Sequence, residues 1–184
     1  MSTLTAEREF DFDDMHFRFL SGLSHKRTGI VLTEQKRDMV YGRLSRRLRA
    51  LELNSFAEYC EFLISPAGEG ELEHMVNAIT TNLTSFFREW HHFEHLRDVV
   101  LPQLESPRLR LWSAACSSGM EPYSMAMVMH QALGDTQVYD ARILATDIDS
   151  NMLEIGEKGV YKTEDVKDFP DPYRPYALPL DTAG

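Results

Sequence analysis

Two features in the second half of the chain have the chemistry of a nucleotide-type binding site. The loop Ala114–Gly119 consists of small residues and stands between a predicted strand and a predicted helix. Such a loop lets a ligand approach the backbone closely and meet free N–H groups. Asp147 ends the next predicted strand, where doubly wound folds bind ribose hydroxyls. Gly119 and Asp147 are 28 positions apart, more than is usual, so the pattern also fits a tight connection followed by a helix cap.

Two other groups of reactive side chains carry weaker signals. His91, His92 and His95 surround Glu94, and His91 and His95 have the i, i+4 spacing of a helical metal-binding pair. The order His-Glu-x-x-His is missing and no third distant ligand is evident, so we interpret them as surface or packing residues and predict no metal. Cys116 lies in the small-residue loop, where its size is sufficient reason for it, and no general base is evident for a nucleophilic role.

A strand–helix–strand unit must position these residues. Residues 109–113 alternate in polarity like a strand, and residues 142–146 indicate a second strand. Between them lies the Met- and Ala-rich stretch 123–133, a predicted helix with Pro122 in its first turn. A short helix over 151–157 follows, which Asp149 or Ser150 can cap. Strand, helix and strand in this order predict a βαβ unit and therefore a parallel sheet.

The first part of the chain has the apolar spacing and the caps of short amphipathic helices. Asp13 can cap a first helix, and Thr33 can cap a second over residues 34–52, where apolar residues recur at helical spacing. Ser55 and the glutamate three residues later match the capping box of a third helix. A fourth is expected over 71–79, after a break that contains Pro and Gly. Together these helices predict a small bundle.

Length and composition fit two small domains. The chain has 184 residues, a formal net charge of −10 and 43% hydrophobic residues, and we predict an all-helical domain over 1–79 and an α/β domain over 80–184. The acidic balance argues against a general nucleic-acid binder. No apolar stretch approaches the roughly 20 residues of a membrane helix, and the acidic N-terminus is unlike a signal peptide. Two cysteines exclude a disulfide scaffold and favour a reducing cytoplasm.

Three long motifs resemble the chemotaxis receptor methyltransferase family (CheR). They are NAITTNLTSFFREWHHFEHL (Asn77–Leu96), LWSAACSSGMEPYSMAM (Leu111–Met127) and ILATDIDSNMLEIGEKGVY (Ile143–Tyr161). The resemblance reaches the helical part through GIVLTEQKRDMVYGRLSRRLRAL (Gly29–Leu51) and covers about residues 14–161. It implies an α/β fold class, with a small helical bundle followed by a Rossmann-like class I methyltransferase domain. It also implies methyl transfer from S-adenosylmethionine to glutamate side chains of chemoreceptors, which leaves glutamate methyl esters and S-adenosylhomocysteine in chemotactic adaptation.

The resemblance implies that three residues of the first motif line the methionine end of the cofactor. They are Asn82, Thr84 and Arg88. We expect Arg88 also to act in catalysis, by orienting the substrate carboxylate or the active-site loop. The alternative for Arg88 is an ordinary arginine on a helix surface.

The resemblance implies three further cofactor contacts in the second and third motifs. Ala115 matches a backbone contact in the small-residue loop. Glu121 matches the acidic residue near the cofactor's amino group, and Asp147 matches the one that holds the ribose. The chain departs from the family pattern at Met120, where members often have a second acidic residue, so any role for a pair of acids is weakened while Glu121 stays in place.

A basic face is predicted on the second helix. Residues 26–50 hold eight Lys or Arg against two acids, and Lys36, Arg43, Arg46 and Arg47 fall near one side of the helix. Such a face suits docking to an acidic helical partner; a solvated helix face is the alternative, and nucleic acid is disfavoured because few aromatics are interleaved. The resemblance implies that this helix meets the cytoplasmic methylation region of membrane chemoreceptors, without insertion into the membrane.

The resemblance stops before the end of the family pattern. Family members continue well beyond this point, so we expect a truncated methyltransferase domain whose sheet is incomplete, with an unpaired hydrophobic edge on its first strand. The last segment, 162–184, contains four prolines and is expected to be a poor source of helix or strand. A non-catalytic module that docks to receptors through helix 34–52 is therefore the alternative to an active enzyme.

Overall fold

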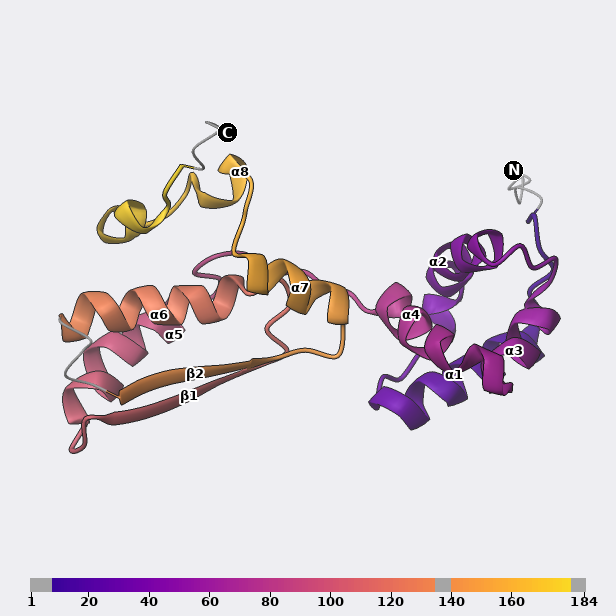
Figure 1. The fold of residues 1–184 in the computed structure, drawn as a ribbon, viewed down its shortest axis with the longest axis horizontal. Helices are drawn as coiled ribbons and strands as arrows, with labels where there is room; N and C mark the ends of the chain where they lie inside the picture. The colour runs from indigo at the N-terminus through magenta and orange to yellow at the C-terminus, as the bar shows by residue number, and fades with distance from the viewer. Residues whose placement is uncertain (1–7, 135–139, 180–184) are drawn as a thin grey trace. The chain divides into compact units, whose positions relative to one another are not determined.

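The computed structural model describes residues 8–134 and 140–179, and the chain divides into two units, Met1–Thr81 and Asn82–Gly184 (Figure 1). The first unit contains α1 (Asp14–Thr28), α2 (Arg37–Ala50), α3 (Phe56–Ile64) and α4 (Glu69–Ile79). The second contains α5 (His91–His95), β1 (Arg108–Ala114), α6 (Met120–Leu133), β2 (Asp140–Thr146), α7 (Ser150–Lys158) and α8 (Thr163–Val166). Among the helices of the described residues, none is both long enough and apolar enough to cross a bilayer.

Local capping signals start two of the helices in the first unit as predicted. Asp13 accepts the His16 N–H at 2.9 Å at the start of α1, and Ser55 Oγ accepts the N–H three residues later at 3.2 Å at the start of α3. Thr33 does not cap α2 with its side chain, so that prediction is wrong. The Lys36 N–H donates instead to the Thr33 carbonyl at 2.8 Å, which closes a 3₁₀ turn, and α2 begins at Arg37 rather than at residue 34.

Helices α1 to α4 bury one apolar core, and a largely buried ion pair links α2 to α4. The core residues come from every helix and include Phe17, Leu20, Val40, Leu44, Leu48, Phe56, Leu63, Met75 and Ile79. Arg47 of α2 donates to both carboxylate oxygens of Glu71 of α4, at 2.9 and 2.6 Å, and the Tyr59 hydroxyl donates to the same carboxylate at 2.9 Å. The Glu71 side chain is only 3% exposed, so this bidentate pair ties α2 to α4 inside the bundle.

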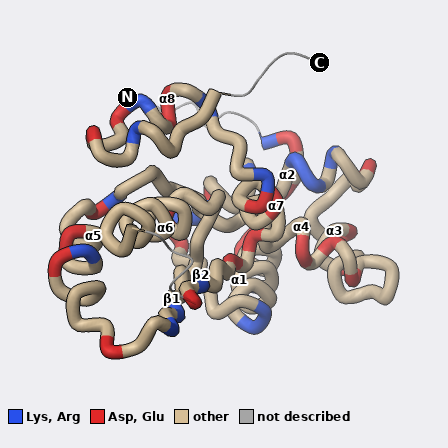
Figure 2. Tube along the Cα trace, turned by 60° about the vertical axis from the view of Figure 1, so that its left-hand side comes forward, with Lys and Arg blue, Asp and Glu red and all other residues tan. Residues whose placement is uncertain are grey.

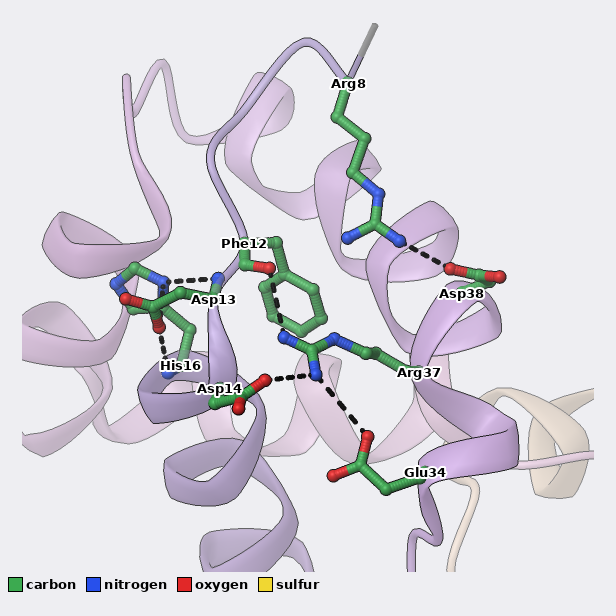
Figure 3. Close-up of polar contacts among 8 residues, drawn as sticks. All are labelled: Arg8, Phe12, Asp13, Asp14, His16, Glu34, Arg37 and Asp38. Atoms are coloured by element: carbon green, nitrogen blue, oxygen red, sulfur yellow. Dashed lines mark hydrogen bonds and ion pairs between the residues drawn. The ribbon is translucent and has the colours of Figure 1, made fainter. Parts of the chain in front are cut away.

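Arginines also tie α1 and the segment before it to α2 (Figure 3). Arg37 donates to Asp14 Oδ1 at 2.5 Å and to the Phe12 carbonyl at 3.3 Å. Arg8 donates to Asp38 Oδ1 at 2.5 Å. Exposed pairs of this kind add little to stability, because water and salt screen the two charges. They nevertheless match part of the positive charge of α2 with acids of the same unit.

The second unit is built on the predicted βαβ arrangement. Strands β1 and β2 pair in parallel, with Leu111 opposite Ile143, and they form the two-stranded sheet of the described residues. Helix α6 connects them and lies against the strands (Figure 1). Leu109 is buried on the helix side, whereas Trp112 and Leu144 are 65% and 58% exposed. The fold class predicted from the sequence, a helical bundle followed by an α/β domain with a parallel sheet, is confirmed.

The proline-rich C-terminal segment forms helices, so the expectation that it would not is wrong. Helix α8 and a 3₁₀ helix over Asp171–Tyr176 follow α7. Pro172 stands in the first turn of that 3₁₀ helix, where a missing N–H costs nothing. Phe169 and Tyr173 are 4% and 1% exposed, and the ring of Tyr173 lies 4.8 Å from that of Phe87. Burial of these aromatic rings offsets the poor helix propensity of the prolines.

Candidate functional site

The strained segment before α5 fixes the position of Arg88. Phe87 and Glu89, on either side of it, have φ values of 53° and 56°, a left-handed conformation that costs roughly 1–3 kcal/mol per residue. The Phe87 N–H donates to the buried hydroxyl of Ser124 at 3.0 Å, which holds this turn against α6. Arg88 Nη1 donates to the Leu83 carbonyl at 2.7 Å while the residue stays exposed. The packing therefore presents the guanidinium at the surface rather than in the core.

The small-residue loop between β1 and α6 has an unusual backbone. Ala115, Ser117 and Gly119 have φ values of 71°, 49° and 85°, all in the left-handed region that favours glycine. The N–H groups of Ala115 and Cys116 both donate to the Thr146 carbonyl, at 2.8 and 2.9 Å. These bonds hold the loop beside the carboxyl end of β2, which is the sheet edge where α/β folds bind ligands.

Two acids at this edge are oriented by hydrogen bonds. Glu121 Oε1 accepts from the buried hydroxyl of Ser113 at 2.7 Å. Asp147 Oδ2 accepts the Ser117 N–H at 2.7 Å, and Asp147 Oδ1 accepts the Asp149 N–H at 2.9 Å. A carboxylate has about four lone-pair positions, so each acid is held in place and keeps acceptor capacity for a ligand.

A small polar pocket of about 190 Å³ brings four of the six predicted cofactor residues together. They are Thr84, Arg88, Ala115 and Glu121. Ser117 also lines it, and the Ser117 Oγ atom is buried without a hydrogen-bond partner among the described residues. Whole ligand pockets measure roughly 300–1,000 Å³, so this one fits one polar end of a ligand. An arginine, a glutamate and an unpaired hydroxyl suit a zwitterionic group.

The other two predicted cofactor residues are not part of the pocket lining. Asn82 Nδ2 donates to Asp149 Oδ2 at 2.6 Å, and Asp147 joins the pocket through its bond to the Ser117 N–H. Sequence reasoning missed Ser117; its place inside the small-residue loop was the available signal. Asp149 was predicted as a possible helix cap and does cap α7, accepting the Asn151 N–H at 3.1 Å.

A second cavity in this unit is larger, and none of the predicted cofactor residues lines it. It measures about 1120 Å³ and is lined mainly by apolar and aromatic side chains of α6, β2 and the segment after α7, among them Phe86, Tyr123, Met127 and Ile143. Among the described residues, its lining contains no arginine, lysine, aspartate or glutamate. Four of the predicted residues therefore meet in the small polar pocket and none of them in this larger cavity.

The structure describes the weaker candidates as well. In the described ranges 8–134 and 140–179, no cluster of three or more His, Cys, Asp or Glu side chains is placed to hold a metal ion. Cys116 is buried, and burial raises the pKa of its thiol, with the Asp147 charge adding to the effect. A raised pKa disfavours the nucleophilic thiolate.

The four residues predicted to dock the receptor, in α2 and in the 3₁₀ turn before it, form two pairs that differ in their contacts. Figure 2 marks the Lys and Arg positions in blue. Lys36 and Arg46 are exposed. Arg43 donates to the Ala78 carbonyl at 3.3 Å and to the Thr80 carbonyl, and Arg47 takes part in the buried contact to α4. Arg43 and Arg47 are one helical turn apart and face α4, so their positive charge serves the bundle itself.

Fold and site together define the class of protein. The second unit is a βαβ unit in which the small-residue loop, the acid after the second strand and the turn that carries Arg88 lie at one edge of the sheet. This arrangement defines a Rossmann-like, cofactor-binding domain, and a helical unit precedes it in the chain. Residues 82–180 match the family model described as the CheR methyltransferase, SAM binding domain, and residues 15–80 match the CheR methyltransferase, all-alpha domain. The chain belongs to the CheR methyltransferase family.

Individual relatives agree with this membership. The chain is 47% identical over 156 residues to the chemotaxis protein methyltransferase of Escherichia coli K12, covering 85% of this chain and 54% of that protein. It is 45% identical over 174 residues to chemotaxis protein methyltransferase 2 of Pseudomonas aeruginosa, covering 94% and 61%. A probable chemotaxis protein methyltransferase of Rhizobium etli is 50% identical over 138 residues, covering 72% and 52%. The chain thus spans about half the length of the curated relatives it matches.

Proposed function

We propose that the protein methylates glutamate side chains of chemoreceptors with S-adenosylmethionine as methyl donor. The observation that carries the proposal is the small polar pocket, in which Thr84, Arg88, Ala115 and Glu121 meet. These residues lie in three loop or helix segments of a domain that matches the family's SAM-binding model. Their convergence is what a cofactor-binding role requires.

The residues present fit the cofactor by their charge. The Glu121 carboxylate would hold the ammonium group of the amino-acid end, and Arg88 would hold its carboxylate or that of the substrate. The unpartnered Ser117 Oγ offers a hydroxyl that such a polar group can satisfy. Asp147, at the carboxyl end of β2, would accept hydrogen bonds from the ribose hydroxyls.

The protein's part in the reaction is positioning. S-adenosylmethionine, when bound, supplies a methyl group made electrophilic by its sulfonium. The substrate glutamate has an ordinary pKa of about 4.3 and is already ionised at neutral pH, so no strong general base is needed. Arg88 orients the carboxylate for in-line attack, and such alignment can supply roughly 7–11 kcal/mol of barrier lowering in favourable cases. Exclusion of water helps further, because charge is neutralised as the reaction proceeds.

The receptor-docking part of the proposal rests on two basic side chains. Lys36 and Arg46 are exposed and form no ion pair within the described residues, so they can steer an acidic helical partner. Arg43 and Arg47 have internal partners and would contribute mainly by holding α2 in place. We also propose that the two units correspond to the two domains, and that the protein works in the cytoplasm, where its free thiols Cys60 and Cys116 stay reduced.

The activity is tested by transfer of labelled methyl from S-adenosylmethionine to receptor-containing membranes. We expect base-labile label on the receptors with the unmodified chain and strongly reduced label with Arg88→Ala. Arg142→Ala, which removes an exposed arginine of β2 (78% exposed side chain), is the matched control and should keep the activity. Receptor binding without methyl transfer would contradict the enzyme and favour the docking module.

A further inference from the structure

One buried acid of the second unit has no place in the proposed reaction. Asp149 is only 2% exposed and stands two positions after Asp147. Its Oδ1 atom accepts the Asn151 N–H at 3.1 Å, and its Oδ2 atom accepts the Asn82 side-chain amide at 2.6 Å. The second distance is short, as is typical of a hydrogen bond to a charged acceptor. A buried carboxylate requires such donors, because it has lost its water.

The same residue orients the acid that would hold the ribose. The backbone N–H of Asp149 donates to Asp147 Oδ1 at 2.9 Å, while the Ser117 N–H donates to Asp147 Oδ2 at 2.7 Å. The Asp147 carboxylate is therefore held between two backbone donors, one from the loop after β1 and one from the segment after β2. The position of the second donor depends on where the buried Asp149 side chain is anchored.

We propose that Asn82 and Asp149 form a positioning pair, the Asn82–Asp149 clamp, which fixes the orientation of Asp147 for the ribose hydroxyls. The inference rests on the proposed function, because it concerns the same cofactor site. It changes the expected role of Asn82: the Asn82 amide acts through Asp149 and not by direct contact with the cofactor. Asp149, which the sequence indicated only as a helix cap, becomes part of the machinery that orders the site.

The clamp is tested by exchanging its two side chains in the full chain. Asn82→Asp places two carboxylates face to face, and Asp149→Asn leaves one carbonyl oxygen to serve two donors, so each single variant breaks the clamp. The double variant, Asn82→Asp with Asp149→Asn, again sets an amide against a carboxylate and keeps an oxygen to cap α7. Asp168→Asn, which removes an exposed carboxylate of the same unit, is the control for loss of charge.

Affinity for S-adenosylhomocysteine, measured by calorimetry, is the first readout. Each single variant should bind about tenfold or more weakly, as when an outer partner that orients a ligating group is lost. The double variant should regain most of the affinity, and Asp168→Asn should keep it. If the double variant binds as weakly as Asn82→Asp, the Asn82 amide itself contacts the cofactor. If the single variants bind like the unmodified chain, the pair has no role in binding. Either result overturns the proposal.

Amide hydrogen exchange in the cofactor-free chain is the second readout. Breaking the clamp should speed exchange of the Ser117 N–H, which donates to Asp147, and should leave the N–H groups of Ala115 and Cys116, which donate to the Thr146 carbonyl, protected. A uniform loss of protection, or none, overturns the positioning role. If the unmodified chain binds no S-adenosylhomocysteine, the proposed function fails, and the exchange pattern still decides for or against the clamp.

Discussion

Replacement of Arg47 by methionine tests whether this arginine holds the helical unit together. The change leaves the Glu71 carboxylate, 3% exposed, without its two bonds from the guanidinium, at 2.9 and 2.6 Å. Removing one partner of a buried ion pair costs about 3–5 kcal/mol. Because the Arg47 side chain is itself 26% exposed, we expect the lower end, about 3 kcal/mol. For a domain of this size each kcal/mol lowers Tm by about 4–8 °C, so the fall should be about 12 °C or more.

The assay is thermal unfolding of the first unit, monitored by far-UV circular dichroism. The neighbouring variant Arg46→Met is the control. Arg46 is exposed, so its replacement should change the free energy of unfolding by no more than about 0.5 kcal/mol. Adding Glu71→Gln to Arg47→Met should recover part of the loss, because the buried charge disappears while Tyr59 keeps a hydrogen-bond partner. If Arg47→Met and Arg46→Met lower the Tm by equally small amounts, Arg47 does not stabilise the bundle, and its predicted role in receptor docking is favoured instead.

Two further predictions concern a hydroxyl and a phenol. Ser117→Ala removes a buried hydroxyl without a described partner, so the cofactor-free chain should gain up to about 1–3 kcal/mol of stability. Its affinity for S-adenosylhomocysteine, measured by calorimetry, should fall. Unchanged stability and affinity would contradict this prediction. Burial raises the pKa of Tyr59 above its ordinary value of 10. Below pH 10 the phenol is neutral in both the folded and the unfolded chain, so its contribution to stability is complete. Above pH 10 only the unfolded chain ionises the phenol, so stability falls as pH rises. In thermal unfolding across pH 9 to 11, roughly the range of this ionisation, Tyr59→Phe should flatten the alkaline decline, and an unaltered slope would count against the assignment.

Local signals were sufficient to predict the βαβ unit and the starts of α1 and α3. The alternation of residues 109–113 and the cap at Asp13 act over a few positions, and the structure keeps both. The start of α2 differed because a backbone bond from Lys36 to Thr33 satisfies the N–H that the Thr33 side chain was expected to take. The carbonyl and the hydroxyl of Thr33 are both local acceptors for this N–H, and a pattern of residue types does not show which of them accepts it.

Contacts between distant positions account for what the sequence did not predict. A helical wheel places Arg47 on the basic side of its helix, but Glu71, its partner, lies 24 positions later. Asn82 meets Asp149 across 67 positions, so its partner could not be inferred from either motif alone. The C-terminal segment was expected to be irregular because prolines were counted, whereas burial of Tyr173 decides its structure.

The most direct test of the central claim is calorimetric titration of the purified chain with S-adenosylhomocysteine beside Asp147→Ala. Asp147 is held by the Ser117 and Asp149 N–H groups at 2.7 and 2.9 Å, so its carboxylate is preorganised for a ligand. We expect binding by the unmodified chain, loss of binding in Asp147→Ala, and retention of binding in Asp168→Ala. A folded chain that gives no binding heat, or that binds equally well without the Asp147 carboxylate, would contradict it.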